Sequence, residues 1–378
     1  MKFLPEHELF RNSVRAFVAR EIAPHVDAWD EAETFPRELY ARTAQVGLLG
    51  IGYPQEYGGT PADGWYRLIA TEEIARAGSG GLMASLFSHK IGLPPVLAHG
   101  SEALKQRIVP GVLRGEKIAA LAITEPSGGS DVAQLRSTAR LDGGQWVIDG
   151  EKVFITSGMR ADWMTVAVRT GGKGAAGISL IAVPGDAPGL TRTPLAKMGW
   201  WCSDTAQIRF DGCRVPADHL IGEESAGFRM IMENFNGERL LMSAGACAFA
   251  QVCHDEALDW ARQRQTFGAA LVSHQAIRHK LMDMHMRIAS TRAWLHGLIE
   301  RQEAGNTGAD WVAELCLLKN HATQTMQFCA DQAVQILGAM GFIRGTKSER
   351  IYREVKVMMI GGGAEEIMKE LAARQLGV

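Results

Sequence analysis

The chain has 378 residues and a hydrophobic content of 46%, which is ample for a large core and long for a single domain. Its 40 Lys and Arg residues against 42 Asp and Glu residues leave a net charge of −2, so neither nucleic acid nor an anionic membrane surface is indicated as a partner. The 6 cysteines include no Cys-x-x-Cys pair and no His cluster beside them, so we expect reduced, mostly buried thiols and no metal site. The first residues carry no apolar signal core and are too acidic for a transit peptide, and no long uncharged apolar run follows, which predicts a cytoplasmic protein without membrane segments.

Hydrophobic periodicity divides the chain into three parts. Apolar residues recur at helical spacing through the first third, which predicts a helical domain over residues 1–117. The period then changes to that of strands separated by Gly- or Pro-rich breaks, which predicts a β domain over residues 118–226. Helical spacing returns after this point and predicts a helical domain over residues 227–378.

Within the predicted β domain, several short apolar segments are typical of strands. They cover residues 118–123, 145–148, 152–156, 164–168, 178–183 and 206–210. The Asp149-Gly150 step between the second and third of these segments is a two-residue turn signal. It predicts a β-hairpin at that point.

The segment Ala122–Asp131 has the sequence Ala-Ile-Thr-Glu-Pro-Ser-Gly-Gly-Ser-Asp and follows a predicted buried strand. Its two glycines let backbone N–H groups approach an anion closely, while Thr124 and Ser130 add hydroxyl donors. Such a turn can hold a phosphate or a ring carbonyl, although glycine by itself usually marks only a turn. The segment 146–158, Trp-Val-Ile-Asp-Gly-Glu-Lys-Val-Phe-Ile-Thr-Ser-Gly, follows and makes the pattern specific.

Together, these two segments resemble the acyl-CoA dehydrogenase family, in which they line the flavin of FAD. The resemblance covers essentially the whole chain. It implies an α+β multidomain fold with an N-terminal helical domain, a central β-barrel-like domain and a C-terminal four-helix bundle. It also implies FAD as the cofactor and an acyl-CoA as the substrate.

By this resemblance, the two segments supply residues that face the flavin. The implied contacts are Ile123 through its backbone, Thr124, Ser130, Phe154, Ile155 and Thr156. Phe154 would pack on the flavin, and Thr156 would bond the reactive flavin nitrogen N5. Taken singly, an aromatic residue on a strand is more often a core residue, and hydroxyl side chains in a turn are more often turn formers. Their joint occurrence at the family spacing favours the flavin site.

Two further motifs resemble parts of an FAD site that subunits share. The segment Arg262–Gly268 resembles a loop that reaches a neighbour's FAD, where the guanidinium of Arg264 would pair with the pyrophosphate. The segment Gln335–Gly341 resembles the adenine-side motif, with Ala339 in place of the usual glycine. The other implied cofactor contacts are Thr266, Phe267, His274, Gln275, Gln335, Gly338 and Glu366. Shared FAD implies a homo-oligomer, a tetramer by resemblance, whereas the arginines alone would indicate only a charged helix end.

The chemistry of this family needs a carboxylate base held dry enough to be basic. Many relatives carry it in a C-terminal Tyr-Glu-Gly-Thr loop, but alignment through Glu366 puts Gly362 at that position. On a helix around Glu238, the same face carries mainly apolar residues. They are Ile231, Phe235, Leu241, Met242, Gly245 and Phe249, with Asn234 as the main polar companion.

A carboxylate on such a stripe is costly unless it is paired or has a raised pKa. A buried Glu238 tied to a neighbour such as Arg239 is therefore one interpretation, and a catalytic base is the other. The long-chain and isovaleryl-CoA dehydrogenases carry the base at this helix position in an Asn/Asp-x-Glu-Arg-Leu context, and this resemblance favours Glu238 as the base.

The resemblance also implies that the amide of Gly362 bonds the thioester carbonyl of the substrate. The implied substrate contacts are Ser130, Asn236, Arg239 and Gly363. We therefore expect α,β-dehydrogenation of a fatty acyl-CoA to the trans-2-enoyl-CoA, with the proton taken by Glu238, hydride by flavin N5, and electrons passed to an electron-transferring flavoprotein. The rival hypotheses are an oxidase or monooxygenase on the same fold, and a non-enzymatic FAD-binding protein associated with nucleic acid, which the near-neutral charge disfavours.

Overall fold

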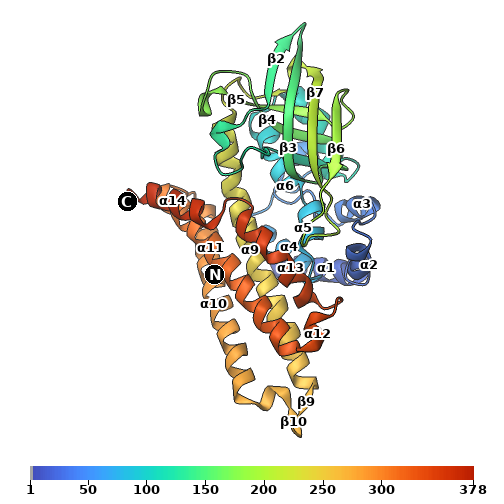
Figure 1. Cartoon of the computed structure of the whole chain (residues 1–378), viewed down its shortest axis with the longest axis vertical. Helices are drawn as coiled ribbons and strands as arrows, with labels where there is room; N and C mark the ends of the chain where they lie inside the picture. Colours follow the sequence, from blue (N-terminus) through green and yellow to red (C-terminus); the bar gives the residue numbers. More distant parts are fainter. Residues whose placement is uncertain (1–2) are drawn as a thin grey trace.

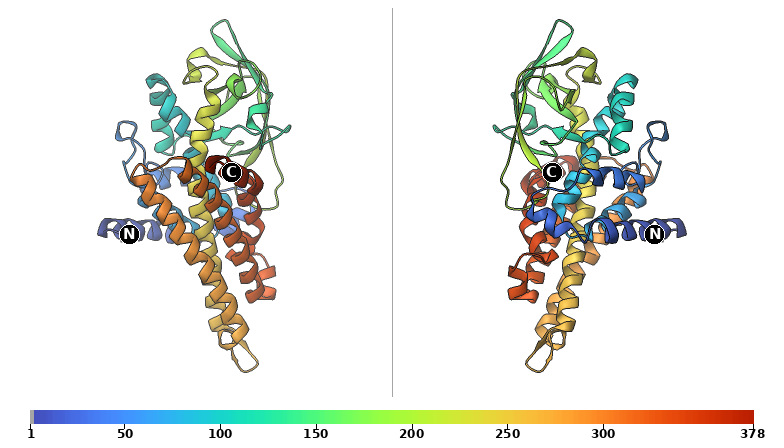
Figure 2. Two further views of the ribbon diagram at one scale, coloured as in Figure 1. Left: turned by 90° about the vertical axis from the view of Figure 1, so that its left-hand side faces the viewer. Right: turned by 90° about the vertical axis from the view of Figure 1, so that its right-hand side faces the viewer.

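The computed structural model describes residues 3–378 and shows an elongated molecule (Figure 1). The β-rich middle of the chain lies at one end, and a bundle of long helices extends from it to the other end. The N-terminal helices pack beside the junction of these two parts, as the rotated views show (Figure 2). The predicted succession of helical, β and helical domains is confirmed. The boundaries after residues 117 and 226 stay a prediction.

The N-terminal part is built from short helices. Its α-helices are α1 (Pro5–Glu21), α2 (Val26–Glu31), α3 (Glu38–Gln45), α4 (Gly64–Ala75), α5 (Gly80–Leu86), α6 (His89–Gly92), α7 (Pro94–His99) and α8 (Glu102–Leu113). Side-chain caps begin some of them: Asp63 accepts N–H bonds at the start of α4, and Ser79 and Ser101 do so for α5 and α8. Helices α1 to α5 share one apolar core, while α7 and α8 pack on a second core with the β domain. Phe17 of α1 and Ile74 of α4 are buried in the first of these cores.

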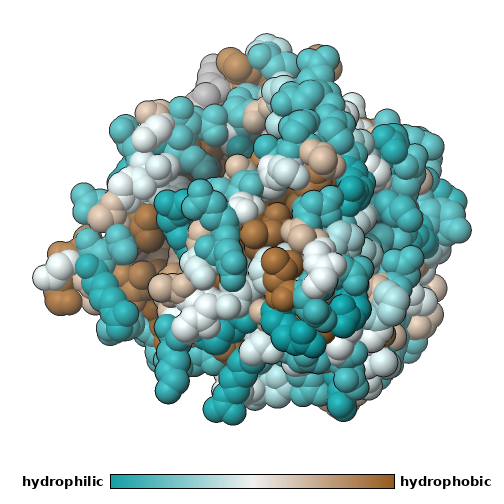
Figure 3. All heavy atoms as spheres, turned by 90° about the horizontal axis from the view of Figure 1, so that it is seen from above, coloured by the Kyte–Doolittle hydropathy of each residue, from teal (hydrophilic) through white to brown (hydrophobic). Residues whose placement is uncertain are grey.

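The middle part is a mixed sheet. Its strands are β1 (Ala119–Ala122), β2 (Thr138–Asp142), β3 (Gln145–Thr156), β4 (Trp163–Arg169), β5 (Ile178–Pro184), β6 (Leu190–Pro194), β7 (Thr205–Pro216) and β8 (Leu220–Ile221). They are ordered β6-β7-β3-β2-β4-β5-β8, and β1 pairs in parallel with β4. Ile148, Val166 and Ile208 are fully buried between its layers. Seen from this end, the molecular surface is mainly hydrophilic with small, separate hydrophobic areas (Figure 3).

The predicted hairpin at Asp149-Gly150 is wrong. β3 continues through this step and pairs antiparallel with β2 on one side and β7 on the other. The register against β7 shifts here in a β-bulge, and a Cβ on Gly150 would lie 2.4 Å from Ser137 Oγ. The tight turn lies between β2 and β3 at Gly143-Gly144, where φ is +58° and +78°. The prediction failed because an Asp-Gly step suits a bulge as well as a turn.

The C-terminal part consists of long helices joined at their ends. Its elements are α9 (Gly227–Gln263), β9 (Gln265–Thr266), β10 (Ala269–Ala270), α10 (Gln275–Glu303), α11 (Ala309–Leu337), α12 (Ala339–Phe342), α13 (Lys347–Ile360) and α14 (Glu365–Leu376). Phe249 of α9, Met284 of α10 and Met326 of α11 meet in the bundle core. The 6 cysteines are free and buried, as expected for structural thiols. No helix in the described part of the chain combines the length and the apolar character needed to cross a membrane.

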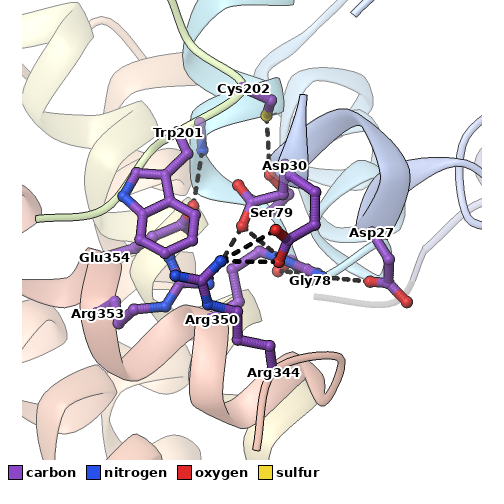
Figure 4. Close-up of polar contacts among 12 residues, drawn as sticks. Asp27, Asp30, Gly78, Ser79, Trp201, Cys202, Arg344, Arg350, Arg353 and Glu354 are labelled. Carbon is purple, nitrogen blue, oxygen red and sulfur yellow. Dashed lines mark hydrogen bonds and ion pairs between the residues drawn. The ribbon is translucent and has the colours of Figure 1, made fainter. Parts of the chain in front are cut away.

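A polar cluster joins α13 to the N-terminal helices (Figure 4). Arg350 of α13 pairs with Asp27, and its Nε lies 3.4 Å from Asp30 Oδ2. Glu354 Oε2, one turn further along α13, accepts the N–H of Gly80 at 2.7 Å. The arginine, Asp30 and Glu354 are buried, so these contacts fix α13 against α2 and α5.

A second buried ion pair fastens β3 to the turn that follows β1. Lys152 Nζ lies 2.8 Å from Glu125 Oε1, and the two side chains are 0% and 4% exposed. The ammonium also donates to the Ile123 carbonyl at 3.0 Å, while the carboxylate accepts the N–H groups of Arg136 and Ser137. Every charge of the pair is therefore compensated inside the protein, and loss of one partner would leave the other unpaired.

Replacing Lys152 by Met should lower the free energy of unfolding by about 3–5 kcal/mol, because the Glu125 carboxylate stays buried without its counter-charge. Urea denaturation followed by circular dichroism at pH 7 measures the loss. The double variant Glu125→Gln/Lys152→Met has no uncompensated carboxylate and should recover part of it. A single variant as stable as the parent protein would contradict the role of the pair.

Candidate active site

The two sequence segments predicted to face a flavin lie against each other. The N–H of Val153 in β3 donates to the Thr124 carbonyl at 2.9 Å, beside the Lys152 contacts to Ile123 and Glu125. The turn after β1 is thus bonded directly to the end of β3. The structure brings together the predicted residues of both segments.

Phe154 is held in a strained conformation with its ring at the surface. The register between β3 and β7 shifts between Lys152 and Ile155, and Phe154 has φ +61° within this β-bulge. A non-glycine residue in this region costs about 1–3 kcal/mol, and bulges re-aim side chains. Phe154 is 68% exposed, whereas Ile155 is buried and Thr156 is half-buried. The bulge therefore turns an aromatic ring outward where a regular strand would alternate.

The residues at this surface fit a flat ring with polar edges. The exposed ring of Phe154 offers an apolar face, and the half-buried Thr124 and Thr156 each bring a hydroxyl group. Ser130 lies exposed in the neighbouring turn, and a Cβ on Gly128 would meet nothing within 4 Å. An isoalloxazine ring has this combination of a flat apolar face and hydrogen-bonding edges, so the residues present fit a flavin.

Glu238 lies on the predicted apolar face of α9. Its neighbours along that face, Ile231, Gly245 and Phe249, are buried, and Glu238 itself is half-buried. Desolvation raises the pKa of Glu238 to about 7, while the positive charges of Arg239 and Lys319 oppose the rise. A carboxyl group with a pKa near neutrality can exchange a proton readily at physiological pH.

The two polar residues expected next to Glu238 make their hydrogen bonds elsewhere. Arg239 donates through Nε to the Gly362 carbonyl at 3.2 Å and through Nη1 to Asn236 Oδ1 at 3.1 Å. Asn234, the predicted polar companion, donates to the Ile91 carbonyl at 2.9 Å. The alternative of a Glu238 tied to Arg239 by an ion pair therefore finds no support in the geometry of Arg239.

A turn of three glycines approaches Glu238 from the end of α13. Gly362 has φ +66°, and a Cβ built on it would lie 4.0 Å from Glu238 Oε1. Side chains at positions 238 and 362 would thus enter the same space. The same Cβ would lie only 2.7 Å from Met242 Sδ, so Met242 fills the room that a side chain at position 362 would need. Glu366, a predicted cofactor contact, is exposed in the first turn of α14 beyond this turn.

A second group of predicted cofactor residues lies at the far end of the long helices, away from β3 (Figure 1). Phe267, between β9 and β10, is 100% exposed with φ +49°, and His274 Nε2 lies 3.1 Å from Thr266 Oγ1 across the hairpin. The group comprises Arg264, Thr266, Phe267, His274 and Gln275 at the hairpin, and Gln335 and Gly338 at the end of α11. Within one chain, this group therefore does not lie next to Thr124, Phe154 and Thr156.

Sequence reasoning did not single out three buried charged residues that hold the site. Lys152 and Glu125 fix the turn after β1, and Lys319 of α11 is 0% exposed and donates to the Gly363 carbonyl at 2.7 Å. A signal was present, because Lys152 begins a predicted strand and Lys319 directly follows apolar residues of a predicted helix. A lysine in such a place is buried only when its ammonium group is paired.

Comparison with known proteins gives the same family along the whole chain. The models of the N-terminal, middle and C-terminal domains of acyl-CoA dehydrogenase match residues 4–116, 120–213 and 225–377. The long-chain specific acyl-CoA dehydrogenase of Sus scrofa is 34% identical over 99% of this chain and 87% of its own length, and an acyl-CoA dehydrogenase of Bacillus subtilis is 33% identical over 100% and 99%.

Among solved structures, a putative acyl-CoA dehydrogenase from Mycobacterium smegmatis superimposes with a TM-score of 0.97 at 45% identity, covering 99% of this chain and 98% of that one. The fold and all three domain models agree. This chain belongs to the acyl-CoA dehydrogenase family of oxidoreductases.

Proposed function

We propose that the protein converts a fatty acyl-CoA into its trans-2-enoyl-CoA with Glu238 as the base. The observation that carries the proposal is the convergence of positions 238 and 362, where a Cβ on Gly362 would lie 4.0 Å from Glu238 Oε1. A carboxylate on α9 can then act where many relatives carry theirs in the loop after α13. The pKa of Glu238, raised by desolvation to about 7, suits a group that must accept a proton near neutral pH.

The residues of the chain divide the chemistry between them. Glu238 removes the proton from the carbon next to the thioester, and the amide of Gly362 donates to the thioester oxygen as negative charge develops there. FAD, the cofactor of this family, would supply the acceptor for the hydride of the next carbon, which leaves a carbon–carbon double bond in the substrate. Ile123, Thr124, Phe154, Ile155 and Thr156 hold the flavin ring.

The contacts to the substrate are proposed for residues around the base. Ser130, Asn236, Arg239 and Gly363 are the residues proposed to contact the thioester and its CoA part. Arg239 is buried and donates hydrogen bonds to Gly362 and Asn236. Its main role would therefore be to hold the glycine turn in place, and binding of the CoA phosphates would be secondary. The likeness to the long-chain specific enzyme supports a fatty acyl chain as the substrate.

A second copy of the chain would complete the cofactor site, in a homo-oligomer that we take to be a tetramer. The hairpin after α9 and the end of α11 would reach the FAD held by the neighbour's β domain, with Arg264 on the pyrophosphate. Large apolar side chains exposed on α12, on α13 and between them support such an interface. They include Met340, Phe342, Ile343, Val357 and Ile360. The family resemblance supports an electron-transferring flavoprotein as the electron acceptor. The free thiols support a cytoplasmic location.

Replacing Glu238 by Gln should reduce the rate of flavin reduction by acyl-CoA by a factor of about 10²–10⁴, the contribution of a positioned general base, while FAD stays bound. Anaerobic stopped-flow absorbance at the flavin band measures the rate. Glu233→Gln on the same helix is the matched control, because Glu233 is 57% exposed and should leave the rate unchanged. A Glu238→Gln variant with near-normal turnover would remove Glu238 as the base.

Glu238→Gln should also change how stability depends on pH. The pKa of Glu238 rises in the folded protein from the ordinary value of 4.5 to about 7, so folding disfavours its ionised form and stability is lost as pH rises through that interval. The variant has no such ionisation. Its Tm should exceed that of the parent at pH 8, and the difference should shrink toward pH 4.5. Glu354, whose pKa is also raised to about 7, contributes equally to both proteins. A difference in Tm that stays constant over this range would contradict the raised pKa.

Two inactive variants should complement each other if subunits share the cofactor. Glu238→Gln lacks the base and Arg264→Ala lacks the pyrophosphate contact, yet a mixed pair contains one site with both residues intact. Random co-assembly should restore about a quarter of the parent activity, because half of the pairs are mixed and each has one intact site of two. Activity of the co-expressed mixture, purified through one tag that both variants carry, tests this. Activity no higher than that of either variant alone would exclude a shared site.

A further inference from the structure

Lys319 is a fully buried lysine in the middle of α11. Its side chain is 0% exposed, and Leu315, Cys316 and Leu318 around it on the helix are buried as well. An ammonium group in such surroundings is costly unless its N–H groups are bonded. Lys319 Nζ donates to two main-chain carbonyls, that of Met359 at 2.9 Å and that of Gly363 at 2.7 Å.

These two carbonyls lie on either side of the glycine turn at the end of α13. Met359 belongs to the last turn of the helix, whose carbonyls lack intrahelical partners and favour a positive charge. Gly363 is the last of the three glycines, with φ +118°. One ammonium group therefore ties the helix end to the far side of the turn and closes the loop that contains Gly362.

The turn needs such support because its sequence provides little. Three consecutive glycines have the greatest backbone freedom that a chain can have, and ordering them is correspondingly unfavourable. Two further contacts act with Lys319. Arg239 Nε holds the Gly362 carbonyl at 3.2 Å, and Asn320 Nδ2 holds the Glu365 carbonyl at 2.9 Å. Side chains of α9 and α11 thus fix the turn from both helices.

The charge of Lys319 also acts on its surroundings. Desolvation lowers the pKa of Lys319 to about 8, and its charge interacts with those of Glu365, Arg239 and Glu238 and with the Cys316 thiol. The positive charges of Arg239 and of Lys319 itself favour the ionised form of Glu238. The same side chain that holds the turn is therefore part of the electrostatic environment of the base.

We propose that Lys319 is a positioning residue for proton abstraction, which holds the Gly361–Gly363 turn in register with Glu238 so that the Gly362 amide meets the thioester oxygen. The proposal rests on the functions proposed for Glu238 and Gly362. Lys319 itself does not touch the substrate. Its contribution is to keep the amide and the carboxylate at a fixed separation.

Lys319→Met tests the proposal, with Lys369→Met as the matched control because Lys369 is exposed on the neighbouring α14. Lys319→Met should retain FAD and reduce the rate of flavin reduction about 10²-fold, the loss that a misplacement of about 1 Å produces, with KM for acyl-CoA changed little. Lys369→Met should behave as the parent.

Two measurements distinguish a positioning role of Lys319 from a loss of activity that has another cause. Amide hydrogen exchange of the peptide covering residues 359–364 should accelerate in Lys319→Met and stay unchanged in Glu238→Gln. A 3-ketoacyl-CoA has no hydride to lose, and its ionisation on binding, seen as long-wavelength absorbance, reports how well the site stabilises negative charge on the thioester oxygen. The apparent pKa of this bound ligand should rise in Lys319→Met.

Unchanged exchange and unchanged ligand ionisation in Lys319→Met would overturn the proposal while leaving Glu238 as the base. Normal turnover in Glu238→Gln would instead overturn the base and leave the effect on exchange intact. If Lys319→Met does not fold, Lys319→Gln keeps an N–H donor without the charge and is measured in the same way. If neither variant yields folded protein, Lys319 is a structural residue and the proposal falls.

Discussion

The candidate site depends on the contact between the end of α13 and the side of α9. At this contact, a turn without side chains meets a carboxylate that the protein has partly removed from water. Removal from water raises the pKa of Glu238 to about 7, and the glycine at position 362 brings no side chain of its own toward this carboxylate. The role proposed for Glu238 needs both the raised pKa and the bare turn, because a base must lie within hydrogen-bond reach of its substrate.

Rigidity at this contact comes from charged groups held inside the protein. Arg239 and Lys319 bond the carbonyls of the glycine turn, while Arg350 and Glu354 fix the rest of α13 against α2 and α5 (Figure 4). The surface proposed to face the flavin follows the same rule, since the buried Lys152 holds the turn that carries Thr124. Main-chain groups of irregular segments need partners when they are buried, and here cationic side chains supply them.

Much of this arrangement could be predicted from the sequence. The features that were not predicted were missed for physical reasons. Helical periodicity alone placed Glu238 on an apolar face, because the period of a helix is fixed. The Asp149-Gly150 step was misread because the same residues suit a bulge and a turn, and only pairing on both sides of β3 decides between them. The outward ring of Phe154 depends on a bulge whose position the local sequence does not encode. Lys319 resembles the many lysines that reach solvent from a helix, and its carbonyl partners lie on another element.

The glycine at position 362 also limits where a carboxylate can be placed in this site. Relatives with the carboxylate in this loop and this chain, with its proposed base on α9, place the same group in the same space from two points of the backbone. The backbone of Gly362 has φ +66°, which disfavours any side chain, and Met242 occupies the room where one would go. A carboxylate at position 362 would need a changed backbone and a shift of the Met242 side chain together. A substitution at position 362 by itself would therefore strain the turn before it could supply a carboxylate there.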